Sequence, residues 1–541
     1  MGESKNKMKL RKNKFLEAWG ATNARITGVF VILVLAIFPL VIHDRYADIL
    51  RFKYWTYIAF CIGLLLALGI TAVIYIYKDA KYYRWSNLKQ MWESFSWRKI
   101  GAPCITMMVF VVVSVISTFQ SEYFYESFWG NEGRYNGLFL TLFYGSCFVI
   151  TSKCLRYKRV YLDLFLAGGI VVSTIGILHY FRIDPLGFKE GLASQTYNMF
   201  FSTIGNANTY TAYLALLAAV STLLFLIEEK KNKRGYYLFA VVVTYMALIT
   251  GLSDNAYLSL GVLFGFLPLY LFKNMKGIKQ YLFLITILAT EIWIVGEVER
   301  RFPGHVLELG SIFNVIARSH FLIWIVIVLW FVVLCIHFLR KTTMEGGGNT
   351  TALVIRKAWA VILALAFVVI CLILIDANLL GNGERYGAIQ NYVVFNDAWG
   401  TLRGFAWRMA VESFQRFPFL HKIFGFGPDT FGILTTQSYS EEMHATYQIF
   451  ENAHNEYLQY LVTVGIAGLL AYLSVLITSV RQMLHQESKR PELMAIIFAI
   501  GCYAVQAVVN LNVLIVVLVM LTLLAVGTAG ARERDEWNQS D

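Results

Sequence analysis

The stretch AWAVILALAFVVICLILID, residues 358–376, contains a single charged side chain and is long enough to cross a bilayer as a helix. Runs of this kind recur along the 541-residue chain, in which 57% of the residues are hydrophobic and 15% are charged. A soluble globular protein needs more polar surface than this. The sequence therefore predicts an all-α polytopic membrane protein.

About 14 apolar runs have roughly the length that a transmembrane helix needs, so we expect 12 to 14 such helices. The runs lie near residues 26–43, 54–77, 101–119, 138–152, 160–181, 208–227, 236–250, 257–272, 280–296, 319–339, 358–376, 455–480, 492–511 and 513–530. The first run lacks a convincing cleavage site, which predicts a retained span rather than a signal peptide.

These runs divide the chain into five expected parts. They are a basic cytoplasmic amino terminus (1–25), transmembrane helices 1–11 (26–376), a long extracytoplasmic loop (377–454), helices 12–14 (455–530) and a cytoplasmic tail (531–541). Two further outer segments, residues 120–137 and 182–207, are also too long and too polar to be simple connections. Long loops of this kind are often functional.

The formal net charge of +12 comes from Lys and Arg residues that cluster between the apolar runs. This distribution is typical of cytoplasmic loops facing anionic lipid, and we expect membrane lipids rather than nucleic acid as partners. With the amino terminus inside, 33 of the 47 Lys and Arg residues fall on the inner side. We therefore expect a multi-pass protein of the cell (cytoplasmic) membrane with both termini cytoplasmic.

Known cofactor motifs are missing from the sequence. The 7 cysteines lie in or beside apolar runs without metal-binding spacing, and we found neither a Gly-rich phosphate loop nor an HExxH motif. We expect no cofactor and no metal.

The long outer loop contains a helix-like stretch from Thr401 to Phe417. In a helical register its apolar face would carry Leu402, Phe405, Ala406 and Met409, and its polar face would carry Arg408, Glu412, Gln415 and Arg416. Arg403 flanks the apolar face, which would turn it toward protein or the membrane interface.

His454 is the candidate general base. It closes the long outer loop within Asn452–Leu458, at the expected outer membrane boundary, where a neutral imidazole can accept a proton. The simpler interpretation is an interfacial histidine that only stabilises a loop. Asn455 or Glu456 could orient the ring.

Arginines on the outer side are candidate substrate-binding residues. Arg134, Arg403 and Arg408 oppose the positive-inside trend, and a guanidinium offers a planar fork that suits phosphate. Each could equally pair with a lipid headgroup or an outer carboxylate.

Asn208 follows Gly205 and Asn206 at the mouth of the sixth span, where it could contact a sugar hydroxyl or merely cap a helix. Asp254 and Glu291 lie in or beside apolar runs, where ionisable groups are costly and often functional. Asp254 is also well placed for a turn between the seventh and eighth spans.

Several of these segments together resemble the O-antigen ligase and polymerase family. The carboxyl-terminal block is the most specific part of the resemblance: GFGPDTF (425–431), AHNEYL (453–458) and VGIAGL (464–469). RGFAW (403–407), the segment from Gly130 to Gly137 and GNANT (205–209) are similar to further family motifs.

One departure concerns a mid-chain span. Where many relatives carry Ser-Arg-Gly, this chain has Ser253-Asp254-Asn255-Ala256, so one family arginine is missing. The departure favours a polymerase or a divergent ligase.

The resemblance implies a membrane glycosyltransferase that moves a glycan from an undecaprenyl-pyrophosphate donor to a sugar hydroxyl of a cell-envelope acceptor or of a second lipid-linked unit. The loop 377–454 would be catalytic, with His454 as base. Arg134, Arg403 and Arg408 would stabilise the leaving pyrophosphate without a metal, and Asn455 and Asn208 would contact substrate. The alternative is a polysaccharide or lipid-linked glycan transporter or flippase, although transporters place their ionisable sites near the bilayer midplane.

Overall fold

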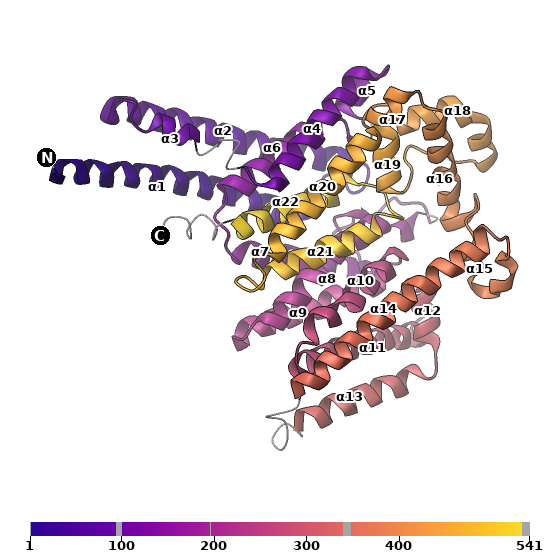
Figure 1. The fold of residues 1–541 in the computed structure, drawn as a ribbon. Coiled ribbons are helices and arrows are strands. Elements are labelled where there is room, and N and C mark those ends of the chain that lie inside the picture. Colours follow the sequence, from indigo (N-terminus) through magenta and orange to yellow (C-terminus); the bar gives the residue numbers. More distant parts are fainter. Residues whose placement is uncertain (1, 94–99, 132, 195, 339–347, 533–541) are drawn as a thin grey trace.

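The computed structural model describes residues 2–93, 100–131, 133–194, 196–338 and 348–532. Most of this part of the chain is helical, with elements numbered up to α22 and one very short hairpin of β1 (Phe200–Phe201) and β2 (Gly205–Asn206) (Figure 1). The expected all-α fold is confirmed.

Long apolar helices form the body of the molecule. They are α1 (Gly2–Ile32), α2 (Ile49–Tyr83), α4 (Ala102–Gln120), α6 (Leu138–Cys154), α7 (Val160–Tyr180), α8 (Ala207–Ile227), α9 (Lys231–Thr250), α10 (Asn255–Leu271), α11 (Met275–Arg301), α13 (Leu322–Phe338), α14 (Gly348–Asn378), α20 (Gly465–Leu484), α21 (Leu493–Gln506) and α22 (Leu514–Arg532). Each of the 14 expected runs overlaps one of these helices, although the first run extends past the end of α1 and the twelfth begins before the start of α20.

Shorter helices connect or cover the long ones. They are α3 (Leu88–Glu93), α5 (Phe124–Trp129), α12 (Ser311–Arg318), α15 (Gln390–Val393), α16 (Trp399–Arg416), α17 (Phe419–Phe424), α18 (Phe431–Thr446) and α19 (Glu456–Thr463).

Within the described residues, nine helices are long and apolar enough to span a membrane on their own. The bent pair of α12 and α13 would make a tenth, and α6, α10 and α21 are shorter apolar helices. The chain is therefore an integral membrane protein with many spans.

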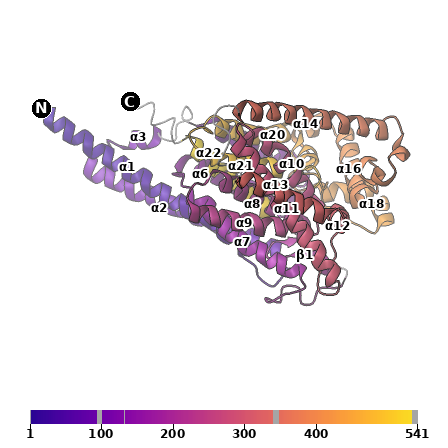
Figure 2. The ribbon, with the colours of Figure 1, turned by 90° about the horizontal axis from the view of Figure 1, so that it is seen from below.

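Two apolar helices differ sharply in their surroundings. The most apolar window of α22 is entirely buried inside the protein, whereas no residue of the corresponding window of α14 is buried. Figure 2 shows α14 running along one edge of the bundle. There it touches α10, where the Trp359 indole N–H donates to the carbonyl of Gly265 at 2.8 Å.

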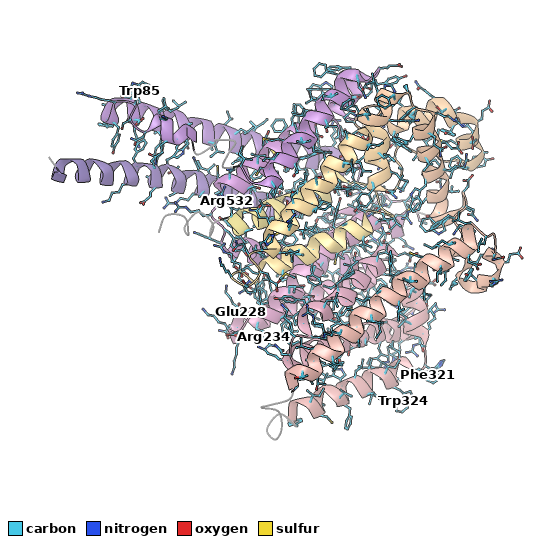
Figure 3. All side chains as sticks on the ribbon, in the orientation of Figure 1. Trp85, Glu228, Arg234, Phe321, Trp324 and Arg532 are labelled. Atoms are coloured by element: carbon cyan, nitrogen blue, oxygen red, sulfur yellow. The ribbon has the colours of Figure 1, made fainter. Side chains whose placement is uncertain are left out.

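The two ends of the bundle carry different structures. Helices α5 and α15–α18 gather at the right of Figure 1, opposite the start of α1. Figure 3 labels Trp85, Glu228, Arg234 and Arg532 at the left-hand end and Phe321 at the other. The end that carries α5 and α15–α18 is called the loop end below.

The expected twelfth span, 455–480, is not one continuous helix. It is divided into α19 and α20 at Val464, and Gly465 has φ +74°. The interruption has a tertiary cause, because the backbone N–H groups of Phe426 and Gly427 donate to the carbonyls of Val462 and Thr463 at 2.9 Å each. The loop that carries Phe426 and Gly427 therefore occupies two carbonyls of the last turn of α19.

Candidate functional site

The long loop, residues 377–454, folds into a small helical unit at the loop end. We call these residues the loop unit. One apolar cluster joins Phe405, Ala406 and Met409 of α16 to Tyr439, Met443 and Phe450, with Leu402 packed against it. A second cluster unites α16, α18 and α19 through Ala410, Phe417, Phe431, Leu434, Ala453 and Val462. The apolar face predicted for this helix is thus confirmed, and it fixes α16 beside the turn that carries His454.

Two glycines allow this unit to dock on the membrane helices. Gly425 has φ +81° and Gly465 has φ +74°, and the two backbones approach so closely that a Cβ on Gly465 would lie 2.2 Å from the carbonyl oxygen of Ile423. From α4, Ser121 donates to the carbonyl of Phe426 at 2.7 Å. The GFGPD segment is therefore a joint between the loop unit and the bundle.

Asp429 connects this joint to the segment that carries Arg134. Its carboxylate accepts the backbone N–H groups of Asn131 and Asn136 at 2.8 and 2.9 Å, on either side of Arg134. Burial raises the pKa of Asp429 to about 6, although the two N–H donors and Arg134 favour its charged form. Asp429 is therefore a positioning residue for Arg134.

His454 lies in the turn just before α19. Its backbone is left-handed, with φ +48°, and its N–H donates to the Asn452 side-chain oxygen at 2.8 Å. Burial, followed by the charges of Arg403 and Arg134, lowers the pKa of His454 to about 4. Within the described part of the chain the imidazole nitrogens make no hydrogen bond, so the ring is neutral and available to a substrate.

Arg134 and Arg403 come from distant parts of the sequence, and the charges of both act on His454. The Nε of Arg134 donates to Glu451 at 3.2 Å, only three residues before His454. Burial lowers the pKa of the Arg403 guanidinium, and the charge of Asp254 partly opposes this. A guanidinium stays charged even so, so two cations face one neutral imidazole.

Arg408 is engaged differently from the other two arginines. It pairs with Asp397 at 2.9 Å, Glu412 at 3.2 Å and Glu442 at 2.6 Å, and these carboxylates raise its pKa. The same side chain lies over the Phe405 ring, with 5.0 Å from Cζ to the centroid. Arg408 thus connects the helices of the loop unit, and its charge is largely neutralised.

The two asparagines proposed as substrate contacts are both engaged within the protein: Asn455 caps a helix, and Asn208 joins two elements. The side-chain oxygen of Asn455 accepts the N–H groups of Tyr457 and Leu458 at 3.0 Å each, at the start of α19. The Asn208 side-chain oxygen accepts the Ser253 hydroxyl at 2.7 Å, joining α8 to the turn before α10.

Glu456 and Asp254 are two further candidates from the sequence, and the structure identifies the partners of both. The Glu456 carboxylate turns toward α21 and accepts the Tyr503 hydroxyl at 2.6 Å, with no contact to His454 among the described hydrogen bonds. Asp254 occupies the expected turn before α10 and acts electrostatically on Arg403. The residue that replaces the family arginine is therefore part of the charged surroundings of the site.

Asp429 and Glu451 are the important residues that sequence reasoning missed. Both act through partners nearly 300 or more positions away in the chain, which no local pattern reveals. The segment Gly425–Phe431, which resembles a family motif, was the one signal that could have identified Asp429.

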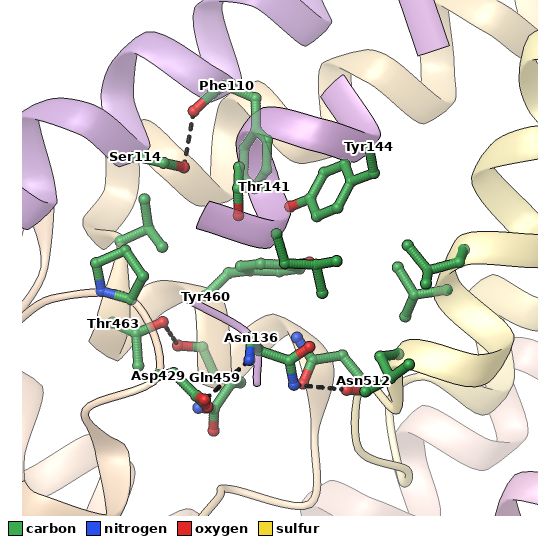
Figure 4. Close-up of a pocket in the computed structure, with 16 residues that line it drawn as sticks. Phe110, Ser114, Asn136, Thr141, Tyr144, Asp429, Gln459, Tyr460, Thr463 and Asn512 are labelled. Atoms are coloured by element: carbon green, nitrogen blue, oxygen red, sulfur yellow. Dashed lines mark hydrogen bonds between the residues drawn. The ribbon is translucent and has the colours of Figure 1, made fainter. Parts of the chain in front are cut away.

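A pocket lies beside this arrangement, on the bundle side of Asp429 (Figure 4). Its cavity volume is about 20 Å³, which is room for little more than one water molecule. Asn136, Asp429, Gln459 and Asn512 give it a polar side, while Phe110, Leu140, Leu514, Val517 and Leu518 from three membrane helices give it an apolar one. His454 and Arg403 do not line it, so the pocket lies behind the segment that carries Arg134.

The fold and the site together define a polytopic membrane protein with a buried arginine and histidine site at one end of its bundle. A family model described as O-antigen ligase matches residues 306–473, so this part of the chain is similar to the O-antigen ligases. The matched residues include Arg403 and His454, whereas Arg134 lies outside them. A comparison with curated proteins finds no match. The match supports, in general terms, a glycan transferase of the O-antigen ligase or polymerase type.

Proposed function

We propose that this protein transfers a glycan from an undecaprenyl-pyrophosphate donor to a sugar hydroxyl, on the outer face of the cytoplasmic membrane. The acceptor is a cell-envelope glycan or a second lipid-linked unit. The observation that carries the proposal is the position of His454, near enough to Arg403 and Arg134 for both charges to lower its pKa, with imidazole nitrogens that make no hydrogen bond among the described residues. A base beside two fixed cations suits an acceptor hydroxyl next to an anionic leaving group.

In the proposed reaction His454 takes the proton of the acceptor hydroxyl. The hydroxyl oxygen of the acceptor at the same time attacks the anomeric carbon of the donor. The bond between that carbon and the phosphate oxygen breaks, and undecaprenyl pyrophosphate leaves with the electron pair. Arg134 and Arg403 stabilise the negative charge that develops on the leaving group, so the chemistry needs no metal. Arg408 supports the loop unit instead, because three carboxylates already surround it.

The proposed orientation places the loop end outside the cell and both termini in the cytoplasm. Support comes from the excess of Lys and Arg in the segments assigned to the inner side. His454, Arg134 and Arg403 belong to loops and to the loop unit, not to the middle of membrane helices. This location favours a transferase over a flippase.

The decisive experiment is reconstitution in liposomes with a lipid-pyrophosphate-linked oligosaccharide, comparing wild type with His454→Ala and Arg403→Ala. A product ladder identifies a polymerase, and a single shift that requires an added acceptor identifies a ligase. The control is Tyr447→Ala, because Tyr447 is 96% exposed at the far end of α18. If wild type moves labelled donor across the bilayer and forms no glycan product, the protein is a flippase and the proposal of a transferase is wrong.

A further inference from the structure

Three aromatic side chains form a cluster where the loop unit begins. Phe395 and Trp399 have ring centroids 5.0 Å apart, and Trp407 lies 4.9 Å from Trp399 and 6.1 Å from Phe395. Phe395 is 44% exposed, and the two tryptophans are half-buried. We call these three residues the aromatic platform.

The platform adjoins the proposed reaction centre. Trp407 follows Arg403 by one helical turn, so the two side chains share a face of α16. Gly404 has no room for a side chain, since a Cβ there would lie 1.8 Å from the carbonyl oxygen of Asn396 and 3.3 Å from the Cβ of Trp399. The platform is therefore packed directly against the helix turn that carries Arg403.

The backbone that joins the platform to Arg403 is unusual. Gly400, Thr401 and Leu402 have φ values of +59°, +58° and +68°, which makes three consecutive left-handed residues. Two of them, Thr401 and Leu402, carry side chains, for which this conformation is strained. Such strain persists where the surrounding structure fixes it, often at binding sites. Here it turns Trp399 and Arg403 toward the same region.

The polar groups near the platform suit a neutral, hydroxyl-rich ligand. Asn391 and Asn396 are exposed, and in the described part of the chain their side-chain amides have no internal partner. The nearest carboxylate, Asp397, pairs with Arg408 at 2.9 Å. Amides can donate to hydroxyl oxygens and accept from hydroxyl hydrogens, whereas an anionic headgroup would call for free Lys or Arg.

We propose that Phe395, Trp399 and Trp407 form a binding platform for a sugar ring of the glycan substrate. A pyranose has an apolar face of C–H groups that stacks on the negative face of an aromatic ring, while its hydroxyls lie at the edge, within reach of amides. The proposal rests on the proposed function and adds to it the residues that hold the sugar.

Membrane anchoring is the competing explanation for aromatic residues near a membrane boundary. An anchoring tryptophan directs its indole N–H toward water or headgroups. Here the N–H of Trp399 donates to the carbonyl of Tyr392 at 3.1 Å, within the protein. The N–H of Trp407 is buried and has no hydrogen-bond partner among the described residues. The rings thus offer carbon surface to the outside, which favours stacking.

The test separates sugar binding from pyrophosphate binding. Full-length protein in nanodiscs is titrated with two probes: the oligosaccharide released by mild acid from the host's lipid-linked glycan, and sugar-free undecaprenyl pyrophosphate. Trp399→Ala should weaken binding of the oligosaccharide by about tenfold and leave binding of the sugar-free lipid unchanged. Trp399→Phe should restore most of the loss, and Phe419→Ala, in an exposed aromatic outside the platform, should change neither.

Either of two results would overturn the platform: unchanged oligosaccharide binding in Trp399→Ala, or an equal loss for the sugar-free lipid, which would indicate a membrane anchor. In turnover assays, a raised KM for the donor alone places the bound sugar on the donor. A raised KM for the acceptor alone places it on the acceptor. Loss of turnover in His454→Ala is independent of these binding results, so the two proposals can fail separately.

Discussion

At the residue scale, the low pKa of His454 is the property with the clearest consequence. An imidazole with a pKa of about 4 is neutral throughout the physiological range, but it is a weak base in the free protein. A bound pyrophosphate would neutralise the charges of Arg134 and Arg403 and make the ring more basic. The substrate would therefore adjust the pKa of the base that acts on it.

The pH dependence of turnover should reveal this adjustment. We expect the acid limb of kcat/KM, which reports the free protein, near pH 4, and the acid limb of kcat at a higher pH. Arg403→Gln should move the kcat/KM limb upward, because it removes a positive charge beside His454. His454→Ala should lower kcat by about 10²- to 10⁴-fold. A kcat/KM limb already at the ordinary histidine value would contradict the electrostatic account.

Asp429 is predicted to affect stability and the position of Arg134 together. Asp429→Ala leaves the part-buried N–H groups of Asn131 and Asn136 without this acceptor, which should cost about 1–3 kcal/mol in total. Because burial raises the pKa of Asp429 to about 6, its carboxyl stabilises the fold fully at low pH, and this contribution is lost as the pH rises through 6.

Thermal unfolding of wild type and Asp429→Asn from pH 4 to 7 checks the sign of this effect. The Asn variant does not titrate at this position, so its melting temperature should rise relative to wild type across this range. A relative fall would mean that the ionised carboxylate is favoured in the fold and that its pKa is depressed.

At the scale of elements, hydropathy and helical periodicity predicted α16 and its apolar face, because that face packs within the loop unit itself. The same patterns could not predict the division between α19 and α20. The sequence is apolar through Val464, and the helix ends there only because the backbone of Phe426 and Gly427 takes over its carbonyls. The partners of Arg134 escaped prediction for the same reason.

Gly465→Ala tests the joint between the loop unit and the bundle. The left-handed conformation and the 2.2 Å approach to Ile423 leave no room for a methyl group. We expect a loss of at least about 2 kcal/mol in unfolding free energy, together with loss of transferase activity. Gly69→Ala is the matched control, since a Cβ on that residue of α2 would have nothing within 4 Å. Equal melting temperatures for the two variants would show that the joint can relax.

At the scale of the whole molecule, the proposed orientation is directly measurable. In intact cells, a membrane-impermeant maleimide should label Tyr447→Cys, because this position is 96% exposed at the loop end. Lys231→Cys, at the exposed start of α9, should react only after permeabilisation. Wild type provides the background from its own free cysteines. The reverse labelling pattern would invert the topology and place His454 in the cytoplasm.

The contrast between α14 and α22 shows what apolar composition cannot report in a membrane protein. Lipid and protein interior accept the same side chains, so hydropathy of 3.2 for α14 and 2.5 for α22 reveals that both are apolar but not what surrounds them. Their tolerance to substitution should consequently differ. Away from the contact with α10, exchanges among Leu, Ile, Val and Phe alter only the lipid contacts of α14. In α22 each exchange changes a closely packed volume, as at Gly527, where a Cβ would lie 2.3 Å from the sulfur of Met483. Sequence drift among apolar residues should therefore accumulate along α14 and be resisted along α22.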